Sequence, residues 1–286
     1  MKISAIIIIA LIIRILSNPC ANAIQKKLSI NNSAITINTY AYLFLSIFCI
    51  IPAFGTDWSI YNFDFWLYVA FSGLLCTLSS VCLIKALETG EMSVLGPINS
   101  YKCIIGLILG AIFLKEYPNL AELFGLIAII LGSWLIFDTT KEGFSIELFK
   151  RKDIILRFLA LIFSGSEAVV IKQIIIMSSA AKSFMLWCFS GLLFSITLMI
   201  ICHKNNKLLN KTDYIKCLEI AIFLGLMQLS TNYVFKHMNV GLSLALFQLS
   251  SIVAVALGYK MFGEKDFIKK IIGTVIMIVG SCMIIL

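Results

Sequence analysis

Residues 90–138 read GEMSVLGPINSYKCIIGLILGAIFLKEYPNLAELFGLIAIILGSWLIFD. Two apolar runs in this stretch are joined by a short polar hinge at residues 115–119. Residues 241–286 follow the same plan, because five positions recur there at one offset of 148 residues. This repeat indicates that the chain contains one structural unit twice. The matched pairs are Glu116 and Glu264, Gly110 and Gly258, Gly125 and Gly273, Gly132 and Gly280, and Ser133 and Ser281.

The composition is that of a membrane protein. The chain has 286 residues, of which 60% are apolar and only 13% are charged, and its mean hydropathy is +0.99. A soluble domain of this size could not hide so much apolar surface. Apolar runs of about 18 or more residues can cross the bilayer as helices, and we identify ten of them. The predicted fold class is therefore all-α integral membrane.

The ten predicted transmembrane helices form two groups of five. We assign residues 1–138 to a first five-helix repeat, 139–153 to a polar linker loop and 154–286 to a second five-helix repeat. Because five is an odd number, the second repeat enters the membrane from the opposite side, and the two repeats are inverted. Many secondary transporters are built in this way, with a midplane site that is exposed to each side in turn. The predicted spans are residues 1–23, 34–54, 65–87, 92–114, 120–137, 154–177, 183–202, 214–235, 241–262 and 267–286.

The first predicted span has features of a secretory signal, because an apolar run precedes the A-x-A-like residues 21–23. Arg14 interrupts that run, however, and nine further spans follow it. We therefore expect residues 1–23 to form the first transmembrane helix, and cleavage is the alternative.

The basic residues gather on one face of the predicted topology. Sixteen Lys and Arg fall on the odd-numbered connections, whereas only four fall on the opposite face. The positive-inside rule then places both termini outside the cytoplasm. A cytoplasmic face near anionic lipid accounts for the net charge of +8. No soluble basic surface is left for a nucleic acid, so the expected partners are the lipid bilayer and a small-molecule substrate.

The order of small residues and glutamates is the same in both copies. In the first copy it runs through Pro97, Gly106, Gly110, Leu114-Lys115-Glu116, Gly125 and Gly132-Ser133, and in the second through Gly258, Gly263-Glu264, Gly273 and Gly280-Ser281. This pattern resembles the EamA-like ten-helix branch of the drug/metabolite transporter superfamily, over essentially the whole chain. The resemblance implies a transporter and leaves the substrate open, because members move amino acids, drugs, nucleotide sugars, polyamines and other metabolites. The second copy lacks a counterpart of Pro97, so we expect the two halves to bend differently.

Two basic residues are predicted to lie deep in the membrane. Arg14 is near the centre of the first span, with Asn18 one turn further on. A charge at the midplane is costly enough that it usually faces a cavity or a partner; the alternative is an arginine that reaches an interface. Lys102 is in the middle of the fourth span and shares a helix face with Asn99. A cation there suits a carboxylate or phosphate of a substrate, or a structural ion pair with another helix.

Glu167 is the only carboxylate predicted to lie deep in a span, and it is in the sixth helix. Apolar burial disfavours the charged form of a carboxylate, and a nearby cation favours it. Glu167 therefore either carries a coupling proton or forms a fixed structural ion pair that neutralises Arg14 or Lys102. The structural ion pair is the simpler hypothesis.

Uncharged polar groups complete the predicted substrate site. Gln228 and Asn232 are one helical turn apart in the eighth span, and Gln248 in the ninth is near the repeat position of Asn99. Tyr101 is a further candidate, and Trp187 is a weaker one because aromatic residues are also common in the interfacial belt. Each amide could instead form a hydrogen bond between helices, which contributes only about 1 kcal/mol in membranes.

Glu116 and Glu264 occur at tight hinges just outside the hydrocarbon. Their recurrence suggests a function, but their position favours a structural role. We expect each to cap the N-terminus of the following helix or to pair with the adjacent Lys115 or Lys265.

No catalytic or cofactor motif is present. The chain lacks a G-x-x-x-x-G-K-[ST] loop for ATP and the H-E-x-x-H and G-x-S-x-G patterns. Its nine cysteines include no C-x-x-C pair and accompany only two histidines, which argues against a metal or haem site. We therefore expect no cofactor and no enzymatic activity, since a membrane enzyme would need a cluster of His, Asp or Cys.

The sequence thus predicts a multi-pass transporter of the cell membrane that carries a small polar metabolite by alternating access. Because the predicted cavity offers both cations and a carboxylate, a zwitterionic amino acid or a related compound is the first substrate hypothesis. Coupling to protons or to exchange fits the pattern. The alternatives are a scaffold or receptor without transport activity and an exporter of drug-like cations. The direction of transport and the oligomeric state, a homodimer included, are left open.

Overall fold

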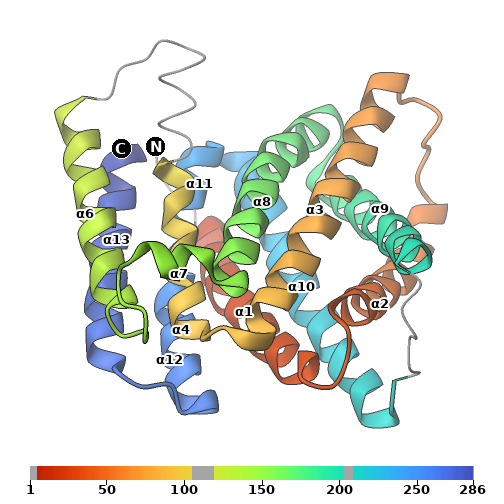
Figure 1. The fold of residues 1–286 in the computed structure, drawn as a ribbon. Coiled ribbons are helices and arrows are strands. Elements are labelled where there is room, and N and C mark those ends of the chain that lie inside the picture. The colour runs from red at the N-terminus through yellow and green to blue at the C-terminus, as the bar shows by residue number, and fades with distance from the viewer. Residues whose placement is uncertain (1–4, 105–118, 203–208, 286) are drawn as a thin grey trace.

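The computed structural model describes residues 5–104, 119–202 and 209–285, and these residues form an all-helical bundle without strands (Figure 1). Nine helices in the described ranges are long and apolar enough to cross a membrane. The fourth predicted span is described only as far as residue 104, so its remainder and the hinge with Glu116 lie outside the described residues. The long helices are α1 (Ala5–Ser29), α2 (Ala34–Phe54), α3 (Phe63–Thr89), α6 (Leu120–Phe137), α8 (Lys152–Met177), α9 (Ala180–Ile201), α10 (Lys211–His237) and α13 (Phe267–Ile285).

The helices of one half pack mainly against helices of the other half. The most extensive interfaces are α6 with α13, α3 with α8, α1 with α10, and α2 with α9. If the first repeat is superposed on the second, α1 corresponds to α8 and α3 to α10, so the α1–α10 and α3–α8 interfaces are equivalent. The other two interfaces each join a helix to its own repeat mate. This pairing is the one expected of inverted halves related by an approximate two-fold axis.

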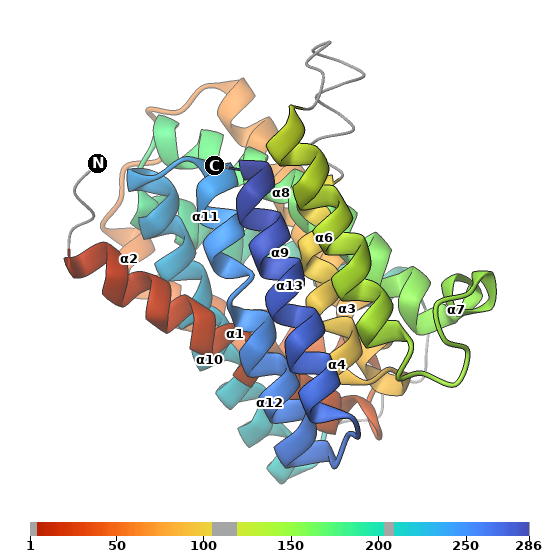
Figure 2. The ribbon, with the colours of Figure 1, turned by 90° about the vertical axis from the view of Figure 1, so that its left-hand side faces the viewer.

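Glycines bring α6 and α13 into backbone contact (Figure 2). A Cβ atom built on Gly132 would lie 2.5 Å from the carbonyl oxygen of Gly273, and one on Gly125 would lie 2.6 Å from that of Gly280. Superposition of the first repeat on the second converts each contact into the other, because Gly125 corresponds to Gly273 and Gly132 to Gly280. Close approach through small residues is a usual way to join helices in membranes. The repeated glycines of the sequence are therefore packing residues.

Both halves contain an interrupted helix beside the bundle centre. In the first half, α4 (Met92–Leu95) is followed by the 3₁₀ helix η1 (Pro97–Ser100). In the second, α11 (Val240–Phe247) is separated from α12 (Ser250–Phe262) by a break at residues 248–249. Both halves therefore bend, and the two interruptions differ in form, since a 3₁₀ helix follows α4 whereas two turn residues separate α11 from α12. The second break occurs without proline, and there Gln248 donates a hydrogen bond from Nε2 to the carbonyl oxygen of Asn99, 3.2 Å away.

The polar linker contains a short helix, α7 (Ile146–Lys150), which begins at the N-cap Ser145. Arg151 at its end forms ion pairs with Glu142 at 2.8 Å and with Asp153 at 2.7 Å. The linker follows Asp138, which forms an ion pair with Lys269 of α13, so α7 lies at the same end of the bundle as the α12–α13 turn.

Substitution of Gly132 or Gly273 by alanine is expected to destabilise the fold, because the added methyl group meets a carbonyl oxygen that cannot rotate away. We expect a loss of about 1–3 kcal/mol, the usual cost of overpacking, and a lower folded yield in detergent. Gly165→Ala is the matched control, since a Cβ at Gly165 has no neighbour within 4 Å. Equal thermal midpoints for all three variants would contradict this packing role.

Candidate substrate cavity

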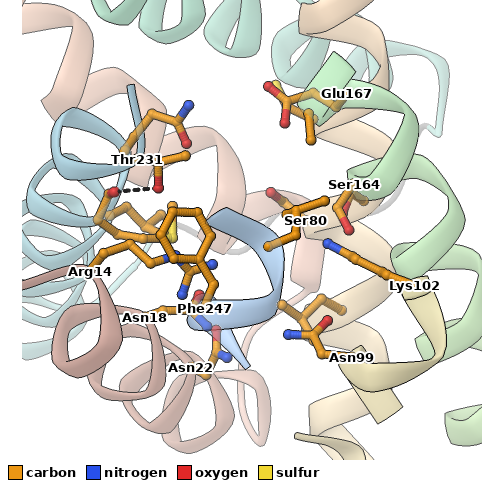
Figure 3. A pocket seen from close by; sticks show the side chains of 18 of the residues that line it. Arg14, Asn18, Asn22, Ser80, Asn99, Lys102, Ser164, Glu167, Thr231 and Phe247 are labelled. Atoms are coloured by element: carbon orange, nitrogen blue, oxygen red, sulfur yellow. Dashed lines mark hydrogen bonds between the residues drawn. The ribbon is translucent and has the colours of Figure 1, made fainter. Parts of the chain in front are cut away.

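A cavity of about 140 Å³ lies between the two halves, next to both interrupted helices (Figure 3). Pockets for drug-sized ligands usually measure about 300–1,000 Å³, so this one suits a small metabolite. Side chains from α1, α3, η1 and the residues just after it, α8, α9, α10 and α11 line it. They include Arg14, Asn18, Asn22, Gln25, Ser79, Ser80, Asn99, Lys102, Arg157, Ser164, Glu167, Trp187, Gln228, Thr231 and Phe247.

One face of α1 supplies a polar stripe to the cavity. Arg14, Asn18, Asn22 and Gln25 all line it, and their spacing of four, four and three residues keeps them on one side of a helix. Gln25 is 3% exposed, and its Oε1 atom has no hydrogen-bond partner among the described residues. α1 therefore faces the cavity with donors and acceptors that the protein itself does not fully satisfy.

Arg14 is in the cavity wall, as the cost of a midplane charge led us to expect. Its guanidinium carbon lies 4.4 Å from the ring centroid of Phe247 in α11, and a cation over an aromatic face is attracted by the ring quadrupole. The Nε and Nη1 atoms of Arg14 are buried without a hydrogen-bond partner in the described part of the chain. The described part of the protein thus leaves two guanidinium donors of Arg14 unsatisfied in this conformation.

Lys102 and Glu167 also line the cavity, but neither forms an ion pair with another described residue. Lys102 extends into the cavity beside Ser164, and Glu167 lies beyond Ser164 along α8 (Figure 3). Glu167 accepts only a long hydrogen bond from the hydroxyl of Ser72, at 3.4 Å. Among the described residues Glu167 thus makes no direct ion pair with Arg14 or Lys102, and its role as their structural partner stays a prediction.

Arg157 is a third cation of the cavity, and sequence reasoning missed it. Its place near the start of the sixth span puts it among the sixteen basic residues that the sequence assigns to one membrane face. In the structure Arg157 is 5% exposed; its Nε donates to the carbonyl oxygen of Leu95 at 2.8 Å and its Nη2 to Oδ1 of Asn99 at 2.5 Å. The long side chain reaches inward to the broken helix rather than outward to the interface. In the sequence, only the position of Arg157 within the sixth span indicated that it could face the interior of the bundle.

Three predicted site residues do not line the cavity. The hydroxyl of Tyr101 is 2.8 Å from that of Ser133 in α6, to which it donates a hydrogen bond. Asn232 is fully buried; it accepts from Gln228 at 2.9 Å and donates to the carbonyl oxygen of Ala180 in α9 at 3.2 Å. Gln248 joins the two broken helices through its bond to Asn99. These side chains satisfy polar groups between helices, which is the alternative that the sequence left open for the amides.

Trp187 lines the cavity, and its indole Nε1 atom is buried without a hydrogen-bond partner among the described residues. Asn18, Asn99 and Gln228 line it as well. Sequence reasoning passed over Asn22, Gln25 and Thr231, although their helical spacing from Arg14 and Gln228 was readable. A search of each predicted helix for polar residues three or four positions apart would have found them.

Glu264 closes one end of the bundle. Its carboxylate accepts the backbone N–H groups of Met92 and Ser93, both at 2.8 Å, and forms an ion pair with Lys26 at 2.9 Å. Lys26 also donates to the carbonyl oxygen of Gly90 at 2.8 Å. We call this group, Lys26, Gly90, Met92, Ser93 and Glu264, the Glu264 strap. It ties the end of α1 to the α3–α4 turn and the α12–α13 turn.

The strap corrects the expectation for Glu264. The residue does cap a helix N-terminus, but the helix is α4 of the other half and not the following helix α13. Its basic partner is Lys26 rather than Lys265. The physical reason is that inversion brings the α12–α13 turn next to the start of α4, whose N–H groups need an acceptor. The sequence-adjacent lysine offers no such bond.

These observations define an integral membrane protein of two inverted helical halves that enclose a charged cavity. The model of the EamA-like transporter family matches residues 5–138 and again residues 151–286. The chain therefore belongs to the EamA-like transporter family of the drug/metabolite transporter superfamily, whose members are membrane transporters of small molecules.

Solved structures with the same fold agree. Twenty-eight chains match, and one of them, described only as "Crystal structure of protein", aligns with a TM-score of 0.67. It covers 97% of this chain and 95% of its own length at 13% sequence identity, which supports the fold alone. A search of curated proteins found no match.

The Glu264 strap predicts a defined pH dependence of stability. Burial alone would raise the pKa of Glu264, but hydrogen bonds from Ser93 and Lys26 outweigh it, and the pKa lies below its ordinary range. A lowered pKa stabilises the folded state at pH values above the ordinary pKa of about 4.3, and this contribution is lost as the pH falls through the folded-state value. Glu264→Gln is expected to cost about 1.5–3 kcal/mol at pH 7.

The difference in thermal midpoint between wild type and Glu264→Gln should shrink as the pH falls below the ordinary glutamate pKa of about 4.3, because there the unfolded chain binds a proton that the folded carboxylate resists. Glu147→Gln is the control, because Glu147 is exposed on α7. A Glu264→Gln effect that stays the same from pH 7 to pH 3.5 would contradict the proposed charge dependence.

Proposed function

We propose that this protein is a secondary transporter that moves a small polar metabolite by alternating access through the cavity between its halves. The single observation that supports this best is a charged and incompletely satisfied cavity wall at the centre of a bundle of apolar helices. Charged groups inside a membrane protein are costly and usually mark the path of a solute or an ion. A scaffold or receptor would have no need of Arg14, Lys102 and Glu167 facing a shared cavity.

Alternating access requires two ends that open in turn, and a lysine holds each end in this structure. Lys26 of α1 binds the carbonyl of Gly90 and the carboxylate of Glu264. At the other end Lys172 of α8, the repeat mate of α1, donates to the carbonyl oxygens of Phe235 and Met238. Carbonyl oxygens alone accept from Lys172, whereas Lys26 also binds a carboxylate. Opening either end requires these contacts to separate, as one half rocks against the other.

The orientation and location follow from the charge pattern. The strap lies at the end that carries α7 and most of the basic connections, and we propose that this end faces the cytoplasm of a cell membrane. A cationic drug is disfavoured as the substrate because the cavity already holds three cations. An amino acid or a related metabolite with an acidic group fits better, and Glu167 remains available as a carrier of a coupling proton.

Transport can be tested with the purified protein in proteoliposomes and a panel of labelled amino acids and organic acids. Wild-type protein is expected to accumulate at least one compound above empty liposomes, and Lys102→Gln is expected to reduce the rate at least tenfold because it removes an unpaired cation from the cavity. Lys85→Gln, an exposed lysine at the end of α3, should retain wild-type rates. Uptake by Lys102→Gln equal to that by Lys85→Gln would contradict the site.

The role of Glu167 can be read from the same assay. If Glu167 carries a coupling proton, Glu167→Gln should lose accumulation driven by a pH gradient and keep exchange between labelled and unlabelled substrate, which needs no net proton movement. Accumulation by Glu167→Gln under a pH gradient, at the wild-type level, would exclude the proton-carrier role.

A further inference from the structure

We propose that the substrate is a small dianion, a compact metabolite with two acidic groups that Arg14 and Lys102 hold from opposite walls of the cavity. This inference rests on the proposed function, because it assigns a substrate class to the same cavity. It differs from the first substrate hypothesis, which was a zwitterion.

The cavity wall carries more positive than negative charge. Its lining contains three cations, Arg14, Lys102 and Arg157, and one carboxylate, Glu167. The formal excess is therefore two positive charges. Charges taken out of water without a partner are expensive, by several kcal/mol per ion even after relaxation. A ligand with two negative charges neutralises this excess, whereas a net-neutral zwitterion leaves it uncompensated.

The bonding of the three cations divides them into two kinds. Arg157 donates hydrogen bonds from Nε to the carbonyl oxygen of Leu95 and from Nη2 to Oδ1 of Asn99, and both acceptors are uncharged. Arg157 therefore adds positive charge to the cavity wall while it holds the broken helix. Arg14 and Lys102 make no hydrogen bond or ion pair with any described residue, and the Nε and Nη1 atoms of Arg14 are buried. These two residues thus carry the donors that are free for a ligand.

The positions of these two residues suggest a two-point site. Arg14 projects from α1 on one wall, and Lys102 projects from the segment after η1 on the facing wall (Figure 3). No described residue accepts a hydrogen bond from Arg14, so a two-donor edge of its guanidinium, Nε with Nη2 or Nη1 with Nη2, can hold a carboxylate or phosphate in a bidentate manner. The ammonium of Lys102 acts as a point charge for a second acidic group. One compact ligand with an acidic group at each end would satisfy both residues.

The remaining lining groups suit the middle of such a ligand. Asn18, Asn22 and Ser80 surround the space between Arg14 and Lys102 (Figure 3), and amides and hydroxyls can both donate and accept. The cavity volume of about 140 Å³ limits the ligand to a small molecule. Dicarboxylates have this chemistry, whereas a phosphate monoester carries its negative charge on one acidic group and therefore tests whether two separate groups are required.

Binding to the purified full-length protein at pH 7 separates these classes. The probes are succinate as a dicarboxylate, glycerol 3-phosphate as a phosphate ester, aspartate, alanine, putrescine and sodium chloride at matched ionic strength. We expect succinate to raise the thermal midpoint at concentrations at least tenfold lower than alanine does. An effect of glycerol 3-phosphate equal to or stronger than that of succinate would contradict the two-point site. No shift with either dianion, or a stronger effect of alanine, putrescine or chloride, would overturn the proposal.

Variants test the two anchoring residues. Arg14→Gln and Lys102→Gln should each weaken the dianion at least tenfold, while Lys102→Arg, which keeps the charge, should weaken it less. Lys85→Gln should bind as wild type does. Size-exclusion profiles and thermal midpoints without ligand establish that each variant is folded. Unchanged dianion binding by a folded Lys102→Gln and a folded Arg14→Gln would overturn the two-point site.

The same probes in proteoliposomes distinguish failure of this inference from failure of the proposed function. Uptake of alanine with no effect of either dianion would overturn the substrate class and support transport. Binding of a dianion without any uptake or exchange would support the substrate class and contradict transport. Saturable uptake of the dianion that binds would support both.

Discussion

Ionised side chains cannot face acyl chains without a large free-energy cost, and this constraint orients the helices of both halves. Arg14 of the first half and Arg157 and Glu167 of the second all turn inward to one cavity. Their helices, α1 and α8, are repeat mates that run in opposite directions through the bundle. Inversion thus brings charges from distant parts of the sequence together at the centre, where neither half alone could enclose them.

The interfaces that surround the cavity differ in how readily they can change. α6 and α13 meet through backbone atoms at Gly132 and Gly273, and such a contact is rigid because no side chain can adjust. The Glu264 strap and the contacts of Lys172 consist of hydrogen bonds at the ends of helices, which can break one at a time. This distribution fits a molecule with a fixed crossing of α6 and α13 and with ends that open in turn. The interrupted helices next to the cavity lie between the rigid α6–α13 contact and the lysine contacts that must break for an end to open.

Most of the fold was predictable from the sequence, since helix length, apolar composition and the offset of 148 residues depend on local residues. The repeated glycines identified the two copies but did not predict that α6 crosses α13 through them, whereas the cost of a midplane charge predicted that Arg14 faces a cavity or a partner. Arg157 and the partners of Glu264 were not predictable. Arg157 lies near a span end, where a flexible side chain can point either way, and only tertiary contacts decide which. Lys26 and Glu264 are far apart in the sequence, so only their arrangement in space pairs them.

The amides show the same limit. Gln228, Asn232 and Gln248 have the same chemistry, yet only Gln228 lines the cavity. Rotation of a helix by one residue changes which amide faces a ligand and which bonds a neighbouring helix, and periodicity does not fix that rotation to within one residue. Charged residues were more informative than amides because burial against lipid is far more costly for them.

The central claim is that two inverted halves enclose the cavity, and the sidedness of corresponding turns tests it most directly. Thr89 at the end of α3 and Asn239 before α11 are both exposed and occupy matching turns of the two repeats. Single cysteines at these positions, in a variant without the native cysteines, can be labelled on intact cells with a membrane-impermeant maleimide. The account predicts that Asn239→Cys labels from outside and Thr89→Cys only after permeabilisation. Labelling of both positions from the same side would contradict it.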